Sequence, residues 1–146
     1  MIDLKTPTVQ QAAMADFFFA YQAFTAKPDE ILARRGLSRV HHRILFFIAQ
    51  YPGLGISELL GYLGVSKQAL NIPLRQLLEM QLVHSSVAAT DKRKRQVGLS
   101  AEGAKLEQAL RREQVRLLQR ALDSAGGEAM RGWLAFNQAL GQSLEH

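Results

Sequence analysis

Polar side chains that could recognise nucleic-acid bases gather near the middle of the chain, after one serine. In the segment SKQALNIPLRQLLEM they recur on the side away from the leucines, at Lys67, Gln68, Asn71 and Arg75. Asparagine and glutamine can bond bidentately to adenine, and lysine or arginine to guanine. Ser66, at the start of the segment, is suited to contact a phosphate. The pattern indicates a helix face that reads bases in the major groove.

A short basic run lies beyond this segment, where Asp91 is followed by Lys92, Arg93, Lys94 and Arg95. Arginine that enters a narrow minor groove gains from the enhanced negative potential there. We therefore expect Lys92, Arg93 and Arg95 to contact the minor groove and phosphates. An acid beside arginines holds their direction, so Asp91 would brace the run. The alternative interpretation is a solvated turn beside a solvated helix face.

The elements expected to carry both groups are a helix-turn-helix followed by a hairpin. A short helix capped by Ser57 and a tight turn at Gly64 would lead into a longer helix that begins at Ser66. The first helix would brace the second, which could then enter the major groove. Residues 82–89 and 96–99 lack a helical period. We expect them to form two short strands joined by the basic run.

Two residues of the longer helix depart from a simple amphipathic pattern. Pro73 lacks the N–H that would bond to the Ala69 carbonyl, so we expect a kink between Ala69 and Pro73. Ile72 is an apolar residue next to Asn71. It could contact a thymine methyl group, but we expect it to cover the core instead.

The remaining segments are predicted to be helical. The first helix, over residues 8–26, should end before Pro28, because the residue before a proline avoids the helical region. Further helices are expected over residues 29–35, 38–50, 100–125 and 128–145. The first helix is apolar on most sides, with Phe17, Phe18 and Phe19 in a row, and it therefore needs cover on most sides. A second copy of the chain would provide that cover.

Composition is typical of one globular domain that faces a polyanion. The 146 residues are 47% hydrophobic, which is enough for a core. The formal net charge is +5, and residues 31–99 hold ten basic but only three acidic side chains. The absence of cysteine excludes disulfides and zinc fingers. No apolar run reaches the ~18 residues of a membrane span, and no signal core is present, so we expect a cytoplasmic protein.

No catalytic motif is recognisable, since the sequence contains no P-loop, no nucleophile elbow and no HExxH segment. The adjacent histidines His41 and His42 point in different directions on a helix, so they do not form a metal pair. We therefore expect no enzymatic activity, no cofactor and no metal. A small enzyme would need a perturbed acid or base in a polar pocket, and only these histidines offer one.

Taken in order, several short motifs resemble the MarR family of bacterial transcriptional regulators. They are Leu37-Ser38, Ile56-Ser57-Glu58-Leu59-Leu60, Gly64-Val65-Ser66-Lys67, Leu82-Val83, Asp91-Lys92-Arg93, Val97, Leu99-Ser100 and Gly103. The resemblance covers nearly the whole chain. It implies an obligate homodimer, joined by the first and the last two helices, that binds pseudo-palindromic operators. It also implies that Arg93 is the wing arginine and that Asp91 positions it.

The resemblance further implies a small-molecule effector, bound between the dimerisation helices and the DNA-binding lobe. The side chains expected to line this pocket are Tyr21, His41, His42 and Tyr51.

The sequence thus predicts a mainly α fold: a winged helix-turn-helix with six or so helices and a two-stranded β-hairpin wing, dimerising through its N- and C-terminal helices. Residues 1–146 would form a single domain, with residues 30–99 as the DNA-binding lobe and residues 1–29 and 100–146 as dimerisation helices. The expected function is sequence-specific transcriptional regulation, with repression as the expected mode and double-stranded DNA as the partner. The alternative is a winged-helix protein-interaction module that binds no DNA.

Overall fold

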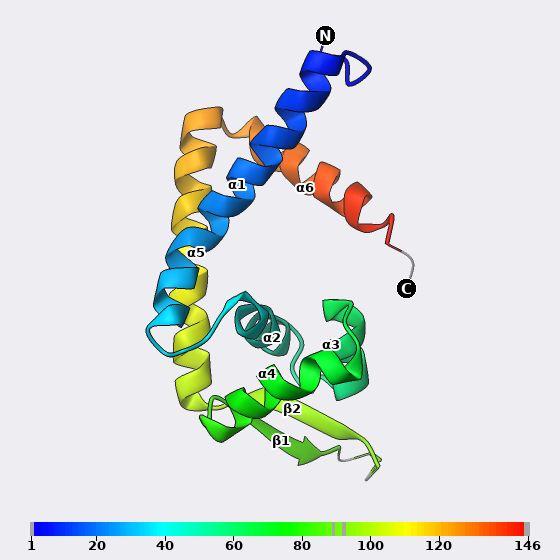
Figure 1. The fold of residues 1–146 in the computed structure, drawn as a ribbon, viewed down its shortest axis with the longest axis vertical. Coiled ribbons are helices and arrows are strands. Elements are labelled where there is room, and N and C mark those ends of the chain that lie inside the picture. The colour runs from blue at the N-terminus through cyan, green and yellow to red at the C-terminus, as the bar shows by residue number, and fades with distance from the viewer. Residues whose placement is uncertain (1, 89, 92, 145–146) are drawn as a thin grey trace.

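The computed structural model describes residues 2–88, 90–91 and 93–144, which form six helices and one two-stranded sheet. In chain order these are α1 (Pro7–Ala33), α2 (Arg39–Gln50), α3 (Ile56–Leu63), α4 (Lys67–Glu79), β1 (Val83–Val87), β2 (Arg95–Leu99), α5 (Ala101–Ala125) and α6 (Glu128–Gly141). Figure 1 shows the long helices α1 and α5 packed side by side, with α2, α3, α4 and the hairpin at one end. The helix α6 leaves the other end of α5 at an angle. The predicted mainly α winged helix-turn-helix is confirmed.

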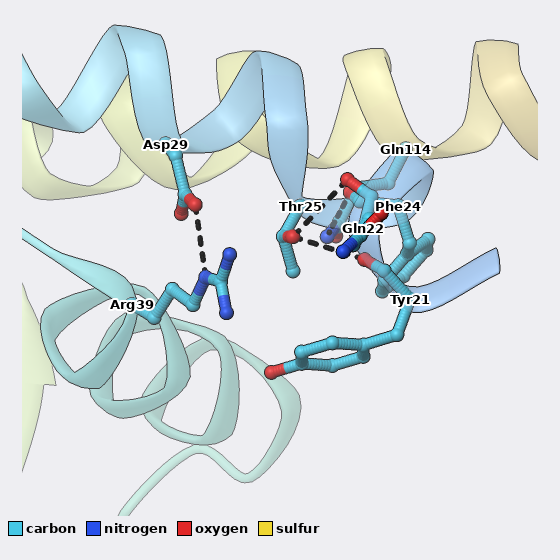
Figure 2. Close-up of polar contacts among 7 residues, drawn as sticks. All are labelled: Tyr21, Gln22, Phe24, Thr25, Asp29, Arg39 and Gln114. Carbon is cyan, nitrogen blue, oxygen red and sulfur yellow. Dashed lines mark hydrogen bonds and ion pairs between the residues drawn. The ribbon is translucent and has the colours of Figure 1, made fainter. Parts of the chain in front are cut away.

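The first helix continues through the proline that was expected to end it. Because α1 runs to Ala33, the predicted break before Pro28 and the separate helix over residues 29–35 are wrong. Pro28 cannot bond to the Phe24 carbonyl, but Nε2 of Gln114 on α5 donates to that oxygen at 3.3 Å (Figure 2). The ring of Pro28 is also fully buried. Apolar burial and the bond from α5 together offset the lost helical bond.

One hydrophobic core joins the helix-turn-helix to the long helices. Its fully buried leucines and isoleucine are Leu32, Ile44, Leu45, Leu59, Leu70, Leu77, Leu82 and Leu110. Leu32 belongs to α1 and Leu110 to α5, so both long helices contribute side chains to the core of the lobe. Each such side chain contributes ~1.5–3 kcal/mol on burial. The shared core therefore ties the lobe to α1 and α5.

Local capping residues determine where α3 and α4 begin. Gly55 rather than Ser57 caps α3, and Oε1 of Glu58 accepts a hydrogen bond from the Gly55 N–H at 3.1 Å. Gly64 ends α3 with φ 65°, a left-handed conformation that costs glycine little. The helix α4 then begins after Ser66, as predicted. The tight turn between the two helices therefore rests on a glycine and a serine cap.

Pro73 does not end α4, which continues to Glu79 with the proline buried. The Ala69 carbonyl lacks its helical donor there, because proline has no N–H. The kink expected between Ala69 and Pro73 stays a prediction.

The wing is an antiparallel hairpin of β1 and β2, with one backbone bond to the loop before α3 and another that closes its base. The Val97 N–H donates to the Leu54 carbonyl at 2.9 Å, which ties β2 to the loop before α3. At the base, the Ser100 N–H donates to the Leu82 carbonyl at 3.0 Å. The bond to Leu54 orients the hairpin relative to the helix-turn-helix.

Large apolar side chains remain exposed on the helices farthest from the lobe. On α1, the exposed fractions of Phe17, Phe18 and Phe19 are 55%, 67% and 66%. On α6, Trp133 and Phe136 are 48% and 65% exposed. Exposed apolar side chains of this size and number are typical of an interaction surface. None of the described helices combines the length and the hydropathy needed to cross a membrane.

Candidate nucleic-acid interface

The helix α4 turns a polar face outward and an apolar face into the core. Oγ of its cap, Ser66, accepts a hydrogen bond from the Ala69 N–H at 3.1 Å. The side chains predicted to read bases are all exposed, namely Lys67, Gln68, Asn71 and Arg75. The buried residues of the same helix are Leu70, Pro73, Leu74 and Leu77. Because each residue advances ~100° around a helix, the four predicted side chains share one face.

Ile72 stands beside this polar face and is 64% exposed. The expectation that it covers the core is therefore wrong. The helical rotation places it on the side opposite Leu70 and Leu74, which carry the burial.

The tip of the wing presents Arg93 to solvent while Asp91 holds its backbone. Oδ1 of Asp91 accepts a hydrogen bond from the Arg93 N–H at 3.0 Å and lies 3.5 Å from Nε of Arg93. The Arg93 side chain is 93% exposed, so its guanidinium remains open to an anion. Arg95, the first residue of β2, is exposed as well. Lys92, the other basic residue expected to contact DNA, lies outside the described residues.

The wing and α4 lie at the same end of the molecule. The Leu82 N–H donates to the Leu77 carbonyl at 3.0 Å, which bonds the start of the hairpin to the last turn of α4. Figure 1 shows both elements at the end farthest from α6 and the N-terminus. The structure therefore brings the polar helix face and the arginine-bearing tip to one end of one lobe.

The start of α2 is anchored to α1 by a charged contact (Figure 2). Nε of Arg39 donates to Oδ2 of Asp29 at 2.8 Å, and the Arg39 guanidinium lies 5.4 Å from the centre of the Tyr21 ring. The hydrogen bond to Asp29 raises the pKa of Arg39. Sequence reasoning found Tyr21 but missed Asp29 and Arg39 as a pair, because residues ten positions apart on two helices leave no local pattern.

The residues predicted to line an effector pocket do not form one group. Tyr21 lies beside Arg39 at the start of α2, whereas Tyr51 follows the last residue of that helix, about 18 Å away along its axis. Tyr51 stacks instead on Tyr62 of α3, with ring centres 4.6 Å apart. The two tyrosines lie at opposite ends of one helix, so the single chain does not bring them together. An effector at the Tyr21 end stays a prediction.

His41 is only 6% exposed, and both of its ring nitrogens have partners. Nδ1 accepts a hydrogen bond from the Ser38 N–H at 3.0 Å, at the start of α2. Nε2 lies 2.7 Å from Oε1 of Gln76 on α4. Sequence reasoning missed Gln76, because a partner 35 positions away gives no signal in the local pattern.

His42 is half-buried near a buried acid. Burial lowers the pKa of His42, although the Glu107 and Asp29 carboxylates act to raise it. Glu107 is 2% exposed, and its carboxylate is held by Arg111, whose Nε donates to Oε1 at 2.9 Å and whose Nη2 donates to Oε2. In the described part of the chain, no three histidine, aspartate or glutamate side chains are grouped to hold a metal ion.

Comparisons with known proteins agree with this geometry. A family model described as the MarR family matches residues 35–94. The HTH-type transcriptional regulator PetP of Rhodobacter capsulatus is 42% identical over 123 residues, which cover 84% of this chain and 74% of PetP.

Two solved structures show the same fold. The S. aureus MepR–DNA complex has a TM-score of 0.71 at 20% identity, over 90% of this chain and 97% of MepR. The PcaV transcriptional regulator of Streptomyces coelicolor, solved with its natural ligand, has a TM-score of 0.68 at 15% identity, over 99% of both chains.

Proposed function

The chain belongs to the MarR family, and from this premise we propose that it is a transcriptional regulator that binds duplex DNA as a homodimer through α4 and the wing. The observation that carries the proposal is the exposed polar face of α4 at the same end of the lobe as the Arg93 tip. The similarity to the transcriptional regulator PetP and the fold shared with the MepR–DNA complex support this function. Such a regulator acts where its operator is, in the cytoplasm, and we assign it no catalytic role.

In this proposal α4 lies in the major groove. Lys67, Gln68 and Asn71 read bases, while Arg75 contacts a base or the backbone. The exposure of Ile72 leaves it open to contact a thymine methyl group. Ser66, as the exposed cap of α4, is placed to contact a phosphate.

The wing supplies the second contact with DNA. Arg93 enters the minor groove, and Asp91 restricts its direction through the backbone bond at 3.0 Å. Arg95 and Lys92 add contacts with phosphates, which favour binding regardless of sequence.

Dimerisation uses the apolar surface that the single chain leaves open. An apolar cleft between α1, α5 and α6, lined by side chains such as Ala23, Leu118 and Trp133, lies beside the exposed phenylalanines of α1. Residues 1–29 and 100–146 thus join the two copies, and residues 30–99 bind DNA. A twofold axis would set the two α4 helices about 34 Å apart, so the operator should be an inverted repeat.

We infer that binding represses transcription and that a small molecule relieves it. The PcaV regulator, solved with its natural ligand, supports an effector in this fold. The part of the predicted pocket that remains together is the Tyr21 end of α2, where Arg39 offers a cation beside an aromatic ring. His42 lies on the same helix and completes the residues we assign to effector binding.

Fluorescence-anisotropy titration with selected and random duplexes, at ~50 and ~200 mM salt, tests the proposal. Arg93→Ala should weaken binding to every duplex and flatten the slope of log affinity against log salt by about 0.9 for each phosphate that the variant no longer neutralises. Gln68→Ala should cost ~1–3 kcal/mol at one base position only. Arg43→Ala, which removes an exposed arginine on α2 outside the proposed contacts of α4, the wing and the dimer, is the matched control and should change neither quantity. Unchanged affinity in both test variants, or no preference among duplexes, would favour a protein-interaction module instead.

A further inference from the structure

The helix α4 is held by apolar contacts that do not by themselves define its position. Leu70, Leu74 and Leu77 pack into the core, and such burial is non-directional. Pro73 also removes the bond that would join its turn to the Ala69 carbonyl. The C-terminal half of α4, which carries Arg75, is therefore less firmly tied to the N-terminal half. A directional contact on this half would define where Arg75 meets the DNA.

One polar bond from α2 reaches this half of α4, and it comes from the imidazole of His41. A backbone N–H can only donate, so Nδ1 of His41, 3.0 Å from the Ser38 nitrogen, accepts. The ring proton therefore sits on Nε2, which donates to Oε1 of Gln76 at 2.7 Å. His41 is 6% exposed, so its imidazole has little contact with water, whereas Gln76 reaches it from the exposed side of α4. Gln76 follows Arg75 directly in α4.

We propose that His41 is a positioning residue, which sets the placement of α4 on its operator through Gln76 without touching DNA. This inference rests on the proposed function, because it concerns how well α4 discriminates among duplexes. Ser38 holds the other side of the ring at the start of α2, so the ring cannot swing with α4. The bond thereby fixes the C-terminal half of α4 in position relative to α2.

A double-mutant cycle on the full-length protein tests this role. The probes are a duplex that the wild type selects from a random pool and a scrambled duplex of the same length. His41→Gln keeps an acceptor for the Ser38 N–H, since glutamine is favoured at this capping position, but it removes the imidazole bond to Gln76. Gln76→Leu removes the other partner. Gln50→Leu, at the exposed far end of α2, is the matched control.

Each single variant should lower the ratio of the affinity for the selected duplex to that for the scrambled duplex about fivefold. This fold-change corresponds to the free energy of one hydrogen bond. The double variant should lower it no further, because both changes break the same bond. Affinity for the scrambled duplex should stay near the wild-type value, because contacts with phosphates do not depend on the base sequence. Gln50→Leu should leave the ratio unchanged.

Additive losses in the double variant, or an unchanged ratio in both single variants, would overturn the positioning role. A melting temperature that falls with an unchanged ratio would also overturn it, since His41 would then be structural only. A wild type that binds all duplexes equally would overturn the proposed function itself and this inference with it. If the wild type discriminates among duplexes but the losses in the two single variants add up in the double variant, only this inference is overturned.

Discussion

Replacing Gly103 by alanine should destabilise the protein at the joint between the wing and α5. An alanine Cβ at residue 103 would lie 1.9 Å from the Leu82 carbonyl oxygen and 2.8 Å from its carbon, far inside the ~3.5 Å of an ordinary contact. To relieve this steric clash, α5 and the base of the hairpin must move apart. That separation strains the bond from the Ser100 N–H to the same carbonyl, now 3.0 Å long.

The magnitude follows from three contributions. Overpacking costs ~1–3 kcal/mol, and the weakened hydrogen bond adds ~0.5–1.5 kcal/mol. Alanine gains ~0.5–1 kcal/mol over glycine inside a helix. The free energy of unfolding of Gly103→Ala should therefore fall by about 2 kcal/mol relative to the wild type.

Urea unfolding followed by circular dichroism, at one fixed protein concentration, measures this difference. The matched control is Gly61→Ala, because Gly61 also lies inside a helix but has no atom near its would-be Cβ. Gly61→Ala should be more stable than the wild type by ~0.5–1 kcal/mol. If Gly103→Ala were equally stabilising, the close approach of α5 to Leu82 would be refuted.

Two further predictions concern buried charge. Arg111→Ala should lower the free energy of unfolding by ~2 kcal/mol, because it leaves the carboxylate of Glu107 buried without its partner. Adding Glu107→Gln should recover part of this loss, and a double variant as unstable as Arg111→Ala would contradict the prediction. Burial lowers the pKa of His42 below its ordinary value of 6.5, so the unfolded chain takes up a proton that the folded chain resists. Stability should therefore be complete above pH ~6.5 and should fall as the pH drops from there towards the lower folded-state pKa. Denaturant titrations from pH ~7.5 to ~5 should show a shallower fall for His42→Gln than for the wild type, and parallel curves would exclude the effect.

The elements that hold the site were predictable because their signals are local. Ser66 and Ser100 cap α4 and α5 by accepting bonds from backbone N–H groups three residues ahead. A cap of this kind depends on one turn of chain, so residue type and position suffice. The polar face of α4 follows likewise from the ~100° rotation between successive helical residues.

Only the tertiary structure decided the features that depend on distant partners. Local sequence rules predict that a helix ends before Pro28. The helix continues because Gln114, which lies 90 positions beyond Phe24, donates to the Phe24 carbonyl that the proline leaves without its helical donor. The Gln76 partner of His41 is likewise invisible to any local pattern.

The sequence by itself determined the helices from α2 onwards, the hairpin and the polar face of α4, because each arises from interactions within a few residues. Folding decided that α1 runs through its proline, that Ile72 stays exposed and that Tyr21 and Tyr51 lie apart. Those outcomes depend on which surfaces are buried against each other, and burial is a property of the packed chain rather than of any one segment.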